Sequence, residues 1–150
     1  MNHEVLGRLA EMPARLRVLA DGFAGDARKQ PSPGAFSLLE HACHLRDIEL
    51  LAYERRIQRM LHEESPEMPD VDGSVIAAEA DYNANEELGP AMDAFAALRA
   101  LNVAALEALS DEQWSRTGVL DGVAITIAEL ASRMAEHDRA HLAELEALTR

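Results

Sequence analysis

The stretch that decides the fold is Ile127-Ala-Glu-Leu-Ala-Ser-Arg-Met-Ala-Glu-His137-Asp-Arg-Ala-His141-Leu-Ala-Glu-Leu-Glu-Ala-Leu148, close to the end of the sequence. Its apolar residues and two histidines recur every three or four positions, which predicts a helix that buries one continuous face. The members of this stripe are Ile127, Leu130, Met134, His137, His141, Leu145 and Leu148. Because His137 and His141 stand four residues apart, their side chains can reach a common point. A buried imidazole must satisfy a donor and an acceptor, and a metal ion bound by both rings would meet that requirement.

Three further segments have the same helical period. They lie at about residues 2–23, 37–62 and 89–109. Pro13 interrupts the first segment, so a kink or a break is expected there. Four long helices predict an all-α four-helix bundle, and neither a repeat nor a domain boundary divides residues 1–150, so a single domain is expected.

Two predicted capping boxes mark where helices begin: Ser37 with Glu40 opens the second helix, and Thr126 with Glu129 opens the last. Two neighbouring buried stripes are predicted on the second helix. The second of them includes His44, whose side chain is therefore expected to point to the interior. The first stripe consists of Leu39, Cys43, Leu50, Tyr53, Ile57 and Met60.

The connections are of mixed length. Residues 62–72 are acidic and contain proline, which predicts an exposed loop. Residues 74–83 are expected to form a short helix, and this long connection could cover the histidines as a lid. A short helical turn is expected at Ser110–Trp114, and a tight, hairpin-like turn at residues 118–122.

Composition restricts the class of protein. The chain has 150 residues, of which 48% are hydrophobic, so a globular protein is expected. Its net charge of −13 means that phosphate backbones and anionic lipids repel it. Nucleic-acid and membrane partners are therefore not expected. One cysteine, no secretory signal and no membrane-length apolar run predict a cytoplasmic location.

A metal site is the main functional prediction. His44 from the second helix can join His137 and His141, and three imidazoles are a ligand set that zinc, nickel, cobalt or iron(II) accepts. Three protein ligands also leave positions open for water or substrate. The alternative is that the histidines are hydrogen-bonded core residues, which is the commoner role of a single buried histidine.

Several neighbouring side chains could support these ligands. Carboxylates one turn away could orient a ligating imidazole through its outer nitrogen, or could be solvated surface charges. These candidates are Glu40, Asp47, Asp138 and Glu144. His41 could be a fourth ligand, although a position at the pocket rim or the surface is favoured. Cys43 is expected to be a buried structural thiol.

Two motifs carry a resemblance to a known family. The first is Phe36-Ser-Leu-Leu-Glu-His-Ala-Cys-His44-Leu-Arg-Asp47-Ile-Glu49. The second is Ala124-Ile-Thr-Ile-Ala-Glu-Leu130, which leads into His137-Asp138-Arg-Ala-His141. Together they resemble the DinB-like, or DinB/YfiT-like, superfamily over nearly the whole chain. Two departures are Phe36, where the family often has tryptophan, and Glu144, near which the family often has glutamine.

The resemblance implies an up-down-down-up bundle, often a homodimer, that holds a divalent ion, commonly zinc or nickel. The implied metal ligands are His44, His137 and His141. Characterised relatives include thiol-dependent enzymes, which implies a low-molecular-weight thiol as a co-substrate.

Three functions are therefore consistent with the sequence. The first is a divalent-metal-dependent enzyme acting on a small molecule, such as a thiol S-transferase or a hydrolase. The second is a non-catalytic, stress-linked bundle that binds a metal or a small molecule. The third is a structural bundle whose histidines only satisfy one another.

Overall fold

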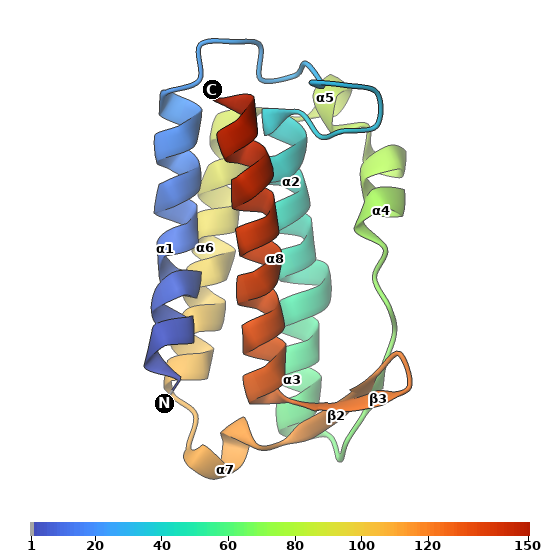
Figure 1. Ribbon diagram of the computed structural model, residues 1–150. Coiled ribbons are helices and arrows are strands. Elements are labelled where there is room, and N and C mark those ends of the chain that lie inside the picture. The colour runs from blue at the N-terminus through green and yellow to red at the C-terminus, as the bar shows by residue number, and fades with distance from the viewer. Residues whose placement is uncertain (1) are drawn as a thin grey trace.

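The computed structural model describes residues 2–150. Four long helical segments run side by side, and in chain order they run up, down, down and up (Figure 1). They are α1 (His3–Asp21), the composite α2–η1–α3 (Leu38–Ile48, Glu49–Glu54 and Arg55–His62), α6 (Leu88–Glu107) and α8 (Ile127–Leu148). The all-α four-helix bundle is thus confirmed.

Helix α1 continues through Pro13 without a break. A proline has no amide hydrogen, so the carbonyl of Leu9, four residues earlier, loses its partner within the helix. That carbonyl accepts a hydrogen bond from Arg99 Nη1 of α6 at 3.0 Å. A side chain from another helix therefore replaces the bond that Pro13 removes, and the predicted break does not occur.

Both predicted capping boxes are present, at Ser37 with Glu40 and at Thr126 with Glu129. The second long helix differs from its prediction at η1, where one turn is a π-helix. A π turn holds more residues than an α turn and shifts the phase of the following side chains. At the start of this turn, Leu50, predicted to be buried, is 41% exposed, whereas Glu49 is fully buried.

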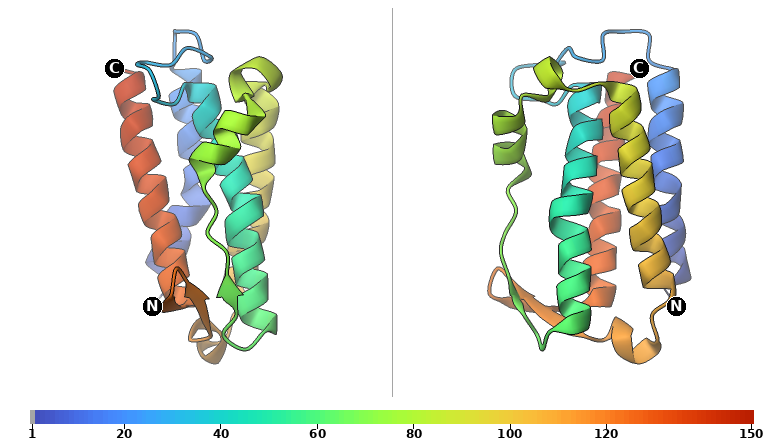
Figure 2. Two further views of the ribbon diagram at one scale, coloured as in Figure 1. Left: turned by 90° about the vertical axis from the view of Figure 1, so that its right-hand side faces the viewer. Right: turned by 180° about the vertical axis from the view of Figure 1, so that it is seen from behind.

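The connections lie along one side and at both ends of the bundle (Figures 1 and 2). Strand β1 (Glu67–Met68) pairs in parallel with β2 (Thr117–Leu120), which forms an antiparallel hairpin with β3 (Val123–Thr126). The hairpin predicted near residues 118–122 is confirmed. Residues 62–72, predicted to be an exposed loop, are mostly exposed, but Pro66 and Met68 are buried and Glu67–Met68 form β1.

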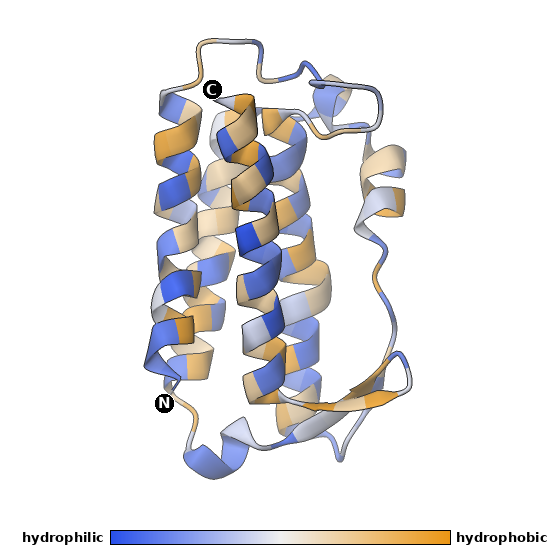
Figure 3. Cartoon of the chain, viewed as in Figure 1, coloured by the Kyte–Doolittle hydropathy of each residue, from blue (hydrophilic) through white to orange (hydrophobic). Residues whose placement is uncertain are grey.

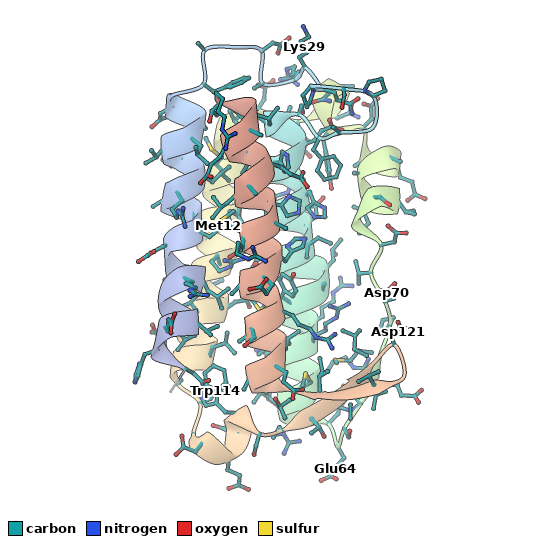
Figure 4. All side chains as sticks on the ribbon, in the orientation of Figure 1. Met12, Lys29, Glu64, Asp70, Trp114 and Asp121 are labelled. Atoms are coloured by element: carbon teal, nitrogen blue, oxygen red, sulfur yellow. The ribbon has the colours of Figure 1, made fainter. Side chains whose placement is uncertain are left out.

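Three short helices complete the chain: α4 (Gly73–Ala80), α5 (Tyr82–Asn85) and α7 (Asp111–Trp114). Helices α4 and α5 contact α2, and the first of them confirms the short helix expected after residue 74. Trp114 lies near the α7 end of the bundle, and Met12 lies on α1 farther along the bundle (Figure 4).

The interior consists of two apolar clusters. Buried polar side chains from α2, η1, α6 and α8 accompany them, and these are Ser37, His41, His44, Glu49, Arg99, Asn102, Asp138 and His141. The middle of α8 is largely hydrophilic in colour (Figure 3). Within residues 2–150, no helix has both the length and the apolar character needed to cross a membrane.

Candidate metal centre

Helices α2 and α8 bring the three predicted histidines together. The Nε2 atom of His137 lies 3.2 Å from Nε2 of His44 and 3.1 Å from Nε2 of His141. His44 and His141 are buried, and His137 is partly buried. Their ligand atoms all lie within 4.8 Å of one another. We call these three residues the histidine triad.

The spacing of the triad suits a metal ion. Two imidazole nitrogens at ordinary zinc–nitrogen bond lengths around a tetrahedral ion lie roughly 3.3 Å apart. The observed separations of 3.1 and 3.2 Å are close to that value. The three nitrogens also converge from two helices, which is the arrangement that a shared ion requires. The donor set and its geometry therefore fit a divalent ion.

The triad is neutral near pH 7, which leaves lone pairs free for a metal. Burial lowers the pKa of His44 and His137 to about 4, and the neighbouring histidines reinforce the effect on His44. Burial and three nearby histidines lower the pKa of His141 to about 2. Protonation would charge an imidazole in a poorly solvated site, so the neutral form is favoured.

These lowered pKa values predict how stability depends on pH. The unfolded chain protonates its histidines near pH 6.5, whereas the folded chain protonates the triad at lower pH. The unfolded state therefore binds more protons between these values, and acidification favours it. We expect the free energy of unfolding of the metal-free protein to fall from pH 7 to pH 5, by up to about 1.4 kcal/mol per pH unit for each such histidine.

Urea denaturation in the presence of a chelator would measure this slope. His44→Gln should make the slope shallower, because it removes one titrating group from the triad. His62→Gln is the matched control, since His62 is exposed on α3, and it should leave the slope unchanged. A free energy that stays constant from pH 7 to pH 5 would contradict the prediction.

His41 is more deeply buried than the sequence indicated. Its side chain is 1% exposed, so of the two expected positions the surface is wrong, whereas His41 does line a pocket. Its Nδ1 lies 2.9 Å from Nδ1 of His141, the nitrogen that faces away from the triad. The edge of His41 also packs against the ring of Phe36, with centroids 5.5 Å apart. His41 therefore contacts the triad from outside it.

The predicted supporting carboxylates are mostly engaged elsewhere. Glu40 accepts hydrogen bonds from Ser37 N and Gln30, which caps α2. Asp47 accepts from Arg46 and Tyr82. None of the hydrogen bonds of residues 2–150 joins Glu40, Asp47 or Asp138 to the triad. These three carboxylates therefore do not orient its imidazoles directly.

Asp138 turns away from the triad because neighbours on a helix point about 100° apart. Its two oxygens accept hydrogen bonds from Arg99 Nη1 and Nη2 at 2.6 and 2.9 Å. Glu144 is the remaining candidate, and its Oε2 lies 3.5 Å from Nε2 of His41. Glu144 thus lies beside His41, and its carboxylate is also within 4.8 Å of a ring nitrogen of His141, a member of the triad.

A buried ion cluster was missed by the sequence reasoning. Arg99 donates to both Glu49 oxygens at 2.9 Å, to Asp138 and to the Leu9 carbonyl, and Asn102 also donates to Glu49. All five guanidinium hydrogens are therefore used. The signal that could have found it is spacing: Arg99 stands four residues after Phe95 and four before Val103, on the buried stripe of α6.

The start of α4 packs directly on the triad. A Cβ atom added to Gly73 would lie 2.8 Å from Nδ1 of His44 and closer still to its Cε1. His44 is held between this backbone and His137, so it has little room to move. A side chain at residue 73 would therefore force α4 or His44 to move, and part of the predicted lid already covers His44.

Gly73→Ala is expected to lower stability by about 1–3 kcal/mol through overpacking, and to displace His44 from the triad. Thermal unfolding and zinc titration would measure the two effects. Gly89→Ala is the matched control, because a Cβ at Gly89 meets nothing within 4 Å. Equal behaviour of the two variants would show that the contact between Gly73 and His44 is unimportant.

A pocket of about 610 Å³ adjoins the site. Its lining is mainly apolar, with two histidines, a serine and a carboxylate, and comprises Pro31, Gly34, Ala35, Phe36, His41, Ser74, His141, Glu144, Ala147 and Leu148. His141 belongs to both the pocket and the triad. A small molecule in the pocket would therefore lie beside the histidines.

The comparisons with known proteins agree with this architecture. Among solved structures, the chain is similar to YfiT from Bacillus subtilis, described as "a probable metal-dependent hydrolase with an unusual four-helix bundle topology". The TM-score is 0.89 and the identity is 20%, over 99% of this chain and 86% of YfiT, so the likeness establishes the fold. A search of the curated proteins found no match. The model of the DinB superfamily matches residues 8–145, and the chain therefore belongs to that superfamily.

Proposed function

We propose that this protein is a divalent-metal-dependent enzyme that acts on a small molecule. The observation that carries the proposal is the convergence of three neutral Nε2 atoms beside a pocket. His44, His137 and His141 would hold the ion. When bound, a divalent ion would supply Lewis acidity to a substrate atom, to water or to a thiol. Zinc and nickel suit three imidazole ligands and are the ions to test first.

The pocket favours an enzyme over the alternative of a non-catalytic, metal-binding bundle. Structural zinc sites are usually closed by four protein ligands, whereas catalytic sites keep a position open. Here the triad would supply three ligands, and His141 also lines the pocket. The apolar wall near Phe36 would exclude water and bind an uncharged part of a substrate. A structural reading of the histidines leaves the pocket beside His141 without a role.

Within this class, we propose transfer of a low-molecular-weight thiol to an electrophile as the first reaction to test. The resemblance to thiol-dependent relatives supports this choice. The chain's own thiol is unsuited to the role, because Cys43 is fully buried and burial raises its pKa to about 12. The thiol would therefore come from solution. Hydrolysis is the second reaction to test, since YfiT is described as a probable hydrolase.

Activity assays on zinc-loaded and nickel-loaded protein would test the proposal. One set would supply cysteine or glutathione with chlorodinitrobenzene as the electrophile, and the other would supply nitrophenyl esters of short acids. We expect metal-dependent turnover in at least one set and none after treatment with a chelator. Metal binding without turnover across a broad panel would favour the non-catalytic alternative. Failure to bind any divalent ion would refute both.

A further inference from the structure

A row of contacting side chains leads from the triad towards the surface. Nδ1 of His141 lies 2.9 Å from Nδ1 of His41, and Nε2 of His41 lies 3.5 Å from Oε2 of Glu144. His41 is almost completely buried, and Phe36 packs against its ring edge, so the ring is held in place. By contrast, the outer nitrogen of His137 has no hydrogen-bond partner. His141 thus has a side-chain partner that His137 lacks.

The hydrogen bond between His41 and His141 can run in two directions. Both imidazoles are neutral, so each carries one ring hydrogen and one lone pair. If His41 donates, His141 carries its own hydrogen on Nε2, which then points into the triad and opposes a metal ion. If His141 donates, its Nε2 lone pair points into the triad. The direction of one hydrogen bond therefore decides whether His141 can be a ligand without rearrangement.

Glu144 favours the direction in which His141 donates the hydrogen bond to His41. A carboxylate attracts a ring N–H and repels a ring lone pair, so Nε2 of His41 prefers to carry the hydrogen. Nδ1 of His41 is then left as an acceptor, and it can only pair with a hydrogen on Nδ1 of His141. Glu144 lies on α8 three residues after His141, so the same helix supplies both ends of this row. Its carboxylate is more than half exposed, which makes its influence weaker than that of His41.

We propose that His41 is a positioning residue that accepts a hydrogen bond from Nδ1–H of His141 and thereby presents the Nε2 lone pair of His141 to a metal ion, with Glu144 setting the orientation of His41. The metal-binding part of this inference rests on the proposed function. The direction of the hydrogen bond does not, because it exists in the metal-free protein.

Two substitutions at position 41 separate positioning from packing. His41→Phe keeps an aromatic ring but removes the acceptor, and it should weaken zinc binding by about 10- to 100-fold, as loss of such outer partners typically does. His41→Asn has its carbonyl oxygen near the place of Nδ1, so it can accept the same hydrogen bond and should restore most of the affinity. Glu144→Gln should have a smaller effect than His41→Phe. Competition with a fluorescent chelator would measure all four affinities, with the wild type as reference.

Nuclear magnetic resonance on metal-free, nitrogen-labelled wild-type protein would test the direction independently. Long-range proton–nitrogen correlations distinguish an imidazole with hydrogen on Nδ1 from one with hydrogen on Nε2. We expect His141 to carry it on Nδ1 in the wild type and in His41→Asn, and to lose that preference in His41→Phe. The cobalt-loaded wild type and His41→Asn should also share one visible spectrum, from which His41→Phe departs.

The outcomes can be told apart. Hydrogen on Nε2 of His141 in the wild type would overturn the inference, as would equal zinc affinity of wild type and His41→Phe. Two ions per chain, the second lost in His41→Asn and in Glu144→Gln, would also overturn it, because His41 and Nδ1 of His141 would then be ligands themselves. Absence of any metal binding in the wild type would refute the proposed function, while the nuclear magnetic resonance result would still decide the direction of the hydrogen bond.

Discussion

Replacing His137 and His141 together by alanine is expected to reduce bound zinc or nickel from about one ion per chain to background, because a single remaining imidazole cannot hold the ion. The three Nε2 atoms lie within one small cluster, so losing two of them removes the site. Mass spectrometry of untagged protein, purified without chelator, would give the metal content.

The same variant should lose the stability that metal provides. An ion that binds only the folded state at 100 times its dissociation constant stabilises that state by about 2.7 kcal/mol. Because the substitutions also leave a small cavity, the quantity to compare is the change in unfolding free energy on adding metal, and not the stability itself. His3→Ala with His62→Ala is the matched control, since both residues are exposed and away from the triad, and it should keep the full metal effect. A metal effect that survives in His137→Ala with His141→Ala would contradict the assignment.

Arg99→Met is expected to lower the free energy of unfolding by about 3–5 kcal/mol, the usual result of removing one partner from a buried ion cluster. The substitution leaves Glu49 and Asp138 buried without their cation, and it leaves the Leu9 carbonyl beside Pro13 without a donor. Arg99 also joins the two helical segments that carry the triad, through Glu49 of η1 and Asp138 of α8. A weaker metal affinity is therefore expected together with the loss of stability.

Urea denaturation would measure the change, and two further variants would show its origin. Arg17→Met removes an exposed ion pair with Asp93 and should cost no more than about 1 kcal/mol. Adding Glu49→Gln and Asp138→Asn to Arg99→Met removes the stranded charges and should recover part of the loss. A loss below about 1 kcal/mol in Arg99→Met alone would show that the cluster contributes little.

Much of the fold could be predicted because it depends on short-range patterns. Apolar residues spaced by three or four positions identified the long helices, and the Ser37 and Thr126 capping boxes marked where two of them begin. The same spacing placed His137 and His141 on one face and His44 on the interior of another helix. These features arise from contacts within a turn or two of helix, and such contacts are visible in the sequence.

Other features depend on partners far away along the chain. Arg99 meets Glu49 across 50 residues and Asp138 across 39, and His41 meets His141 across 100. The sequence by itself therefore determined the helices, their caps and the three candidate ligands. Only the tertiary structure decided the π turn, the burial of Glu49, the continuity of α1 at Pro13 and the partner of His141. The physical reason is that a buried charge or imidazole is stable only beside a complementary group, and packing between helices selects which group that is.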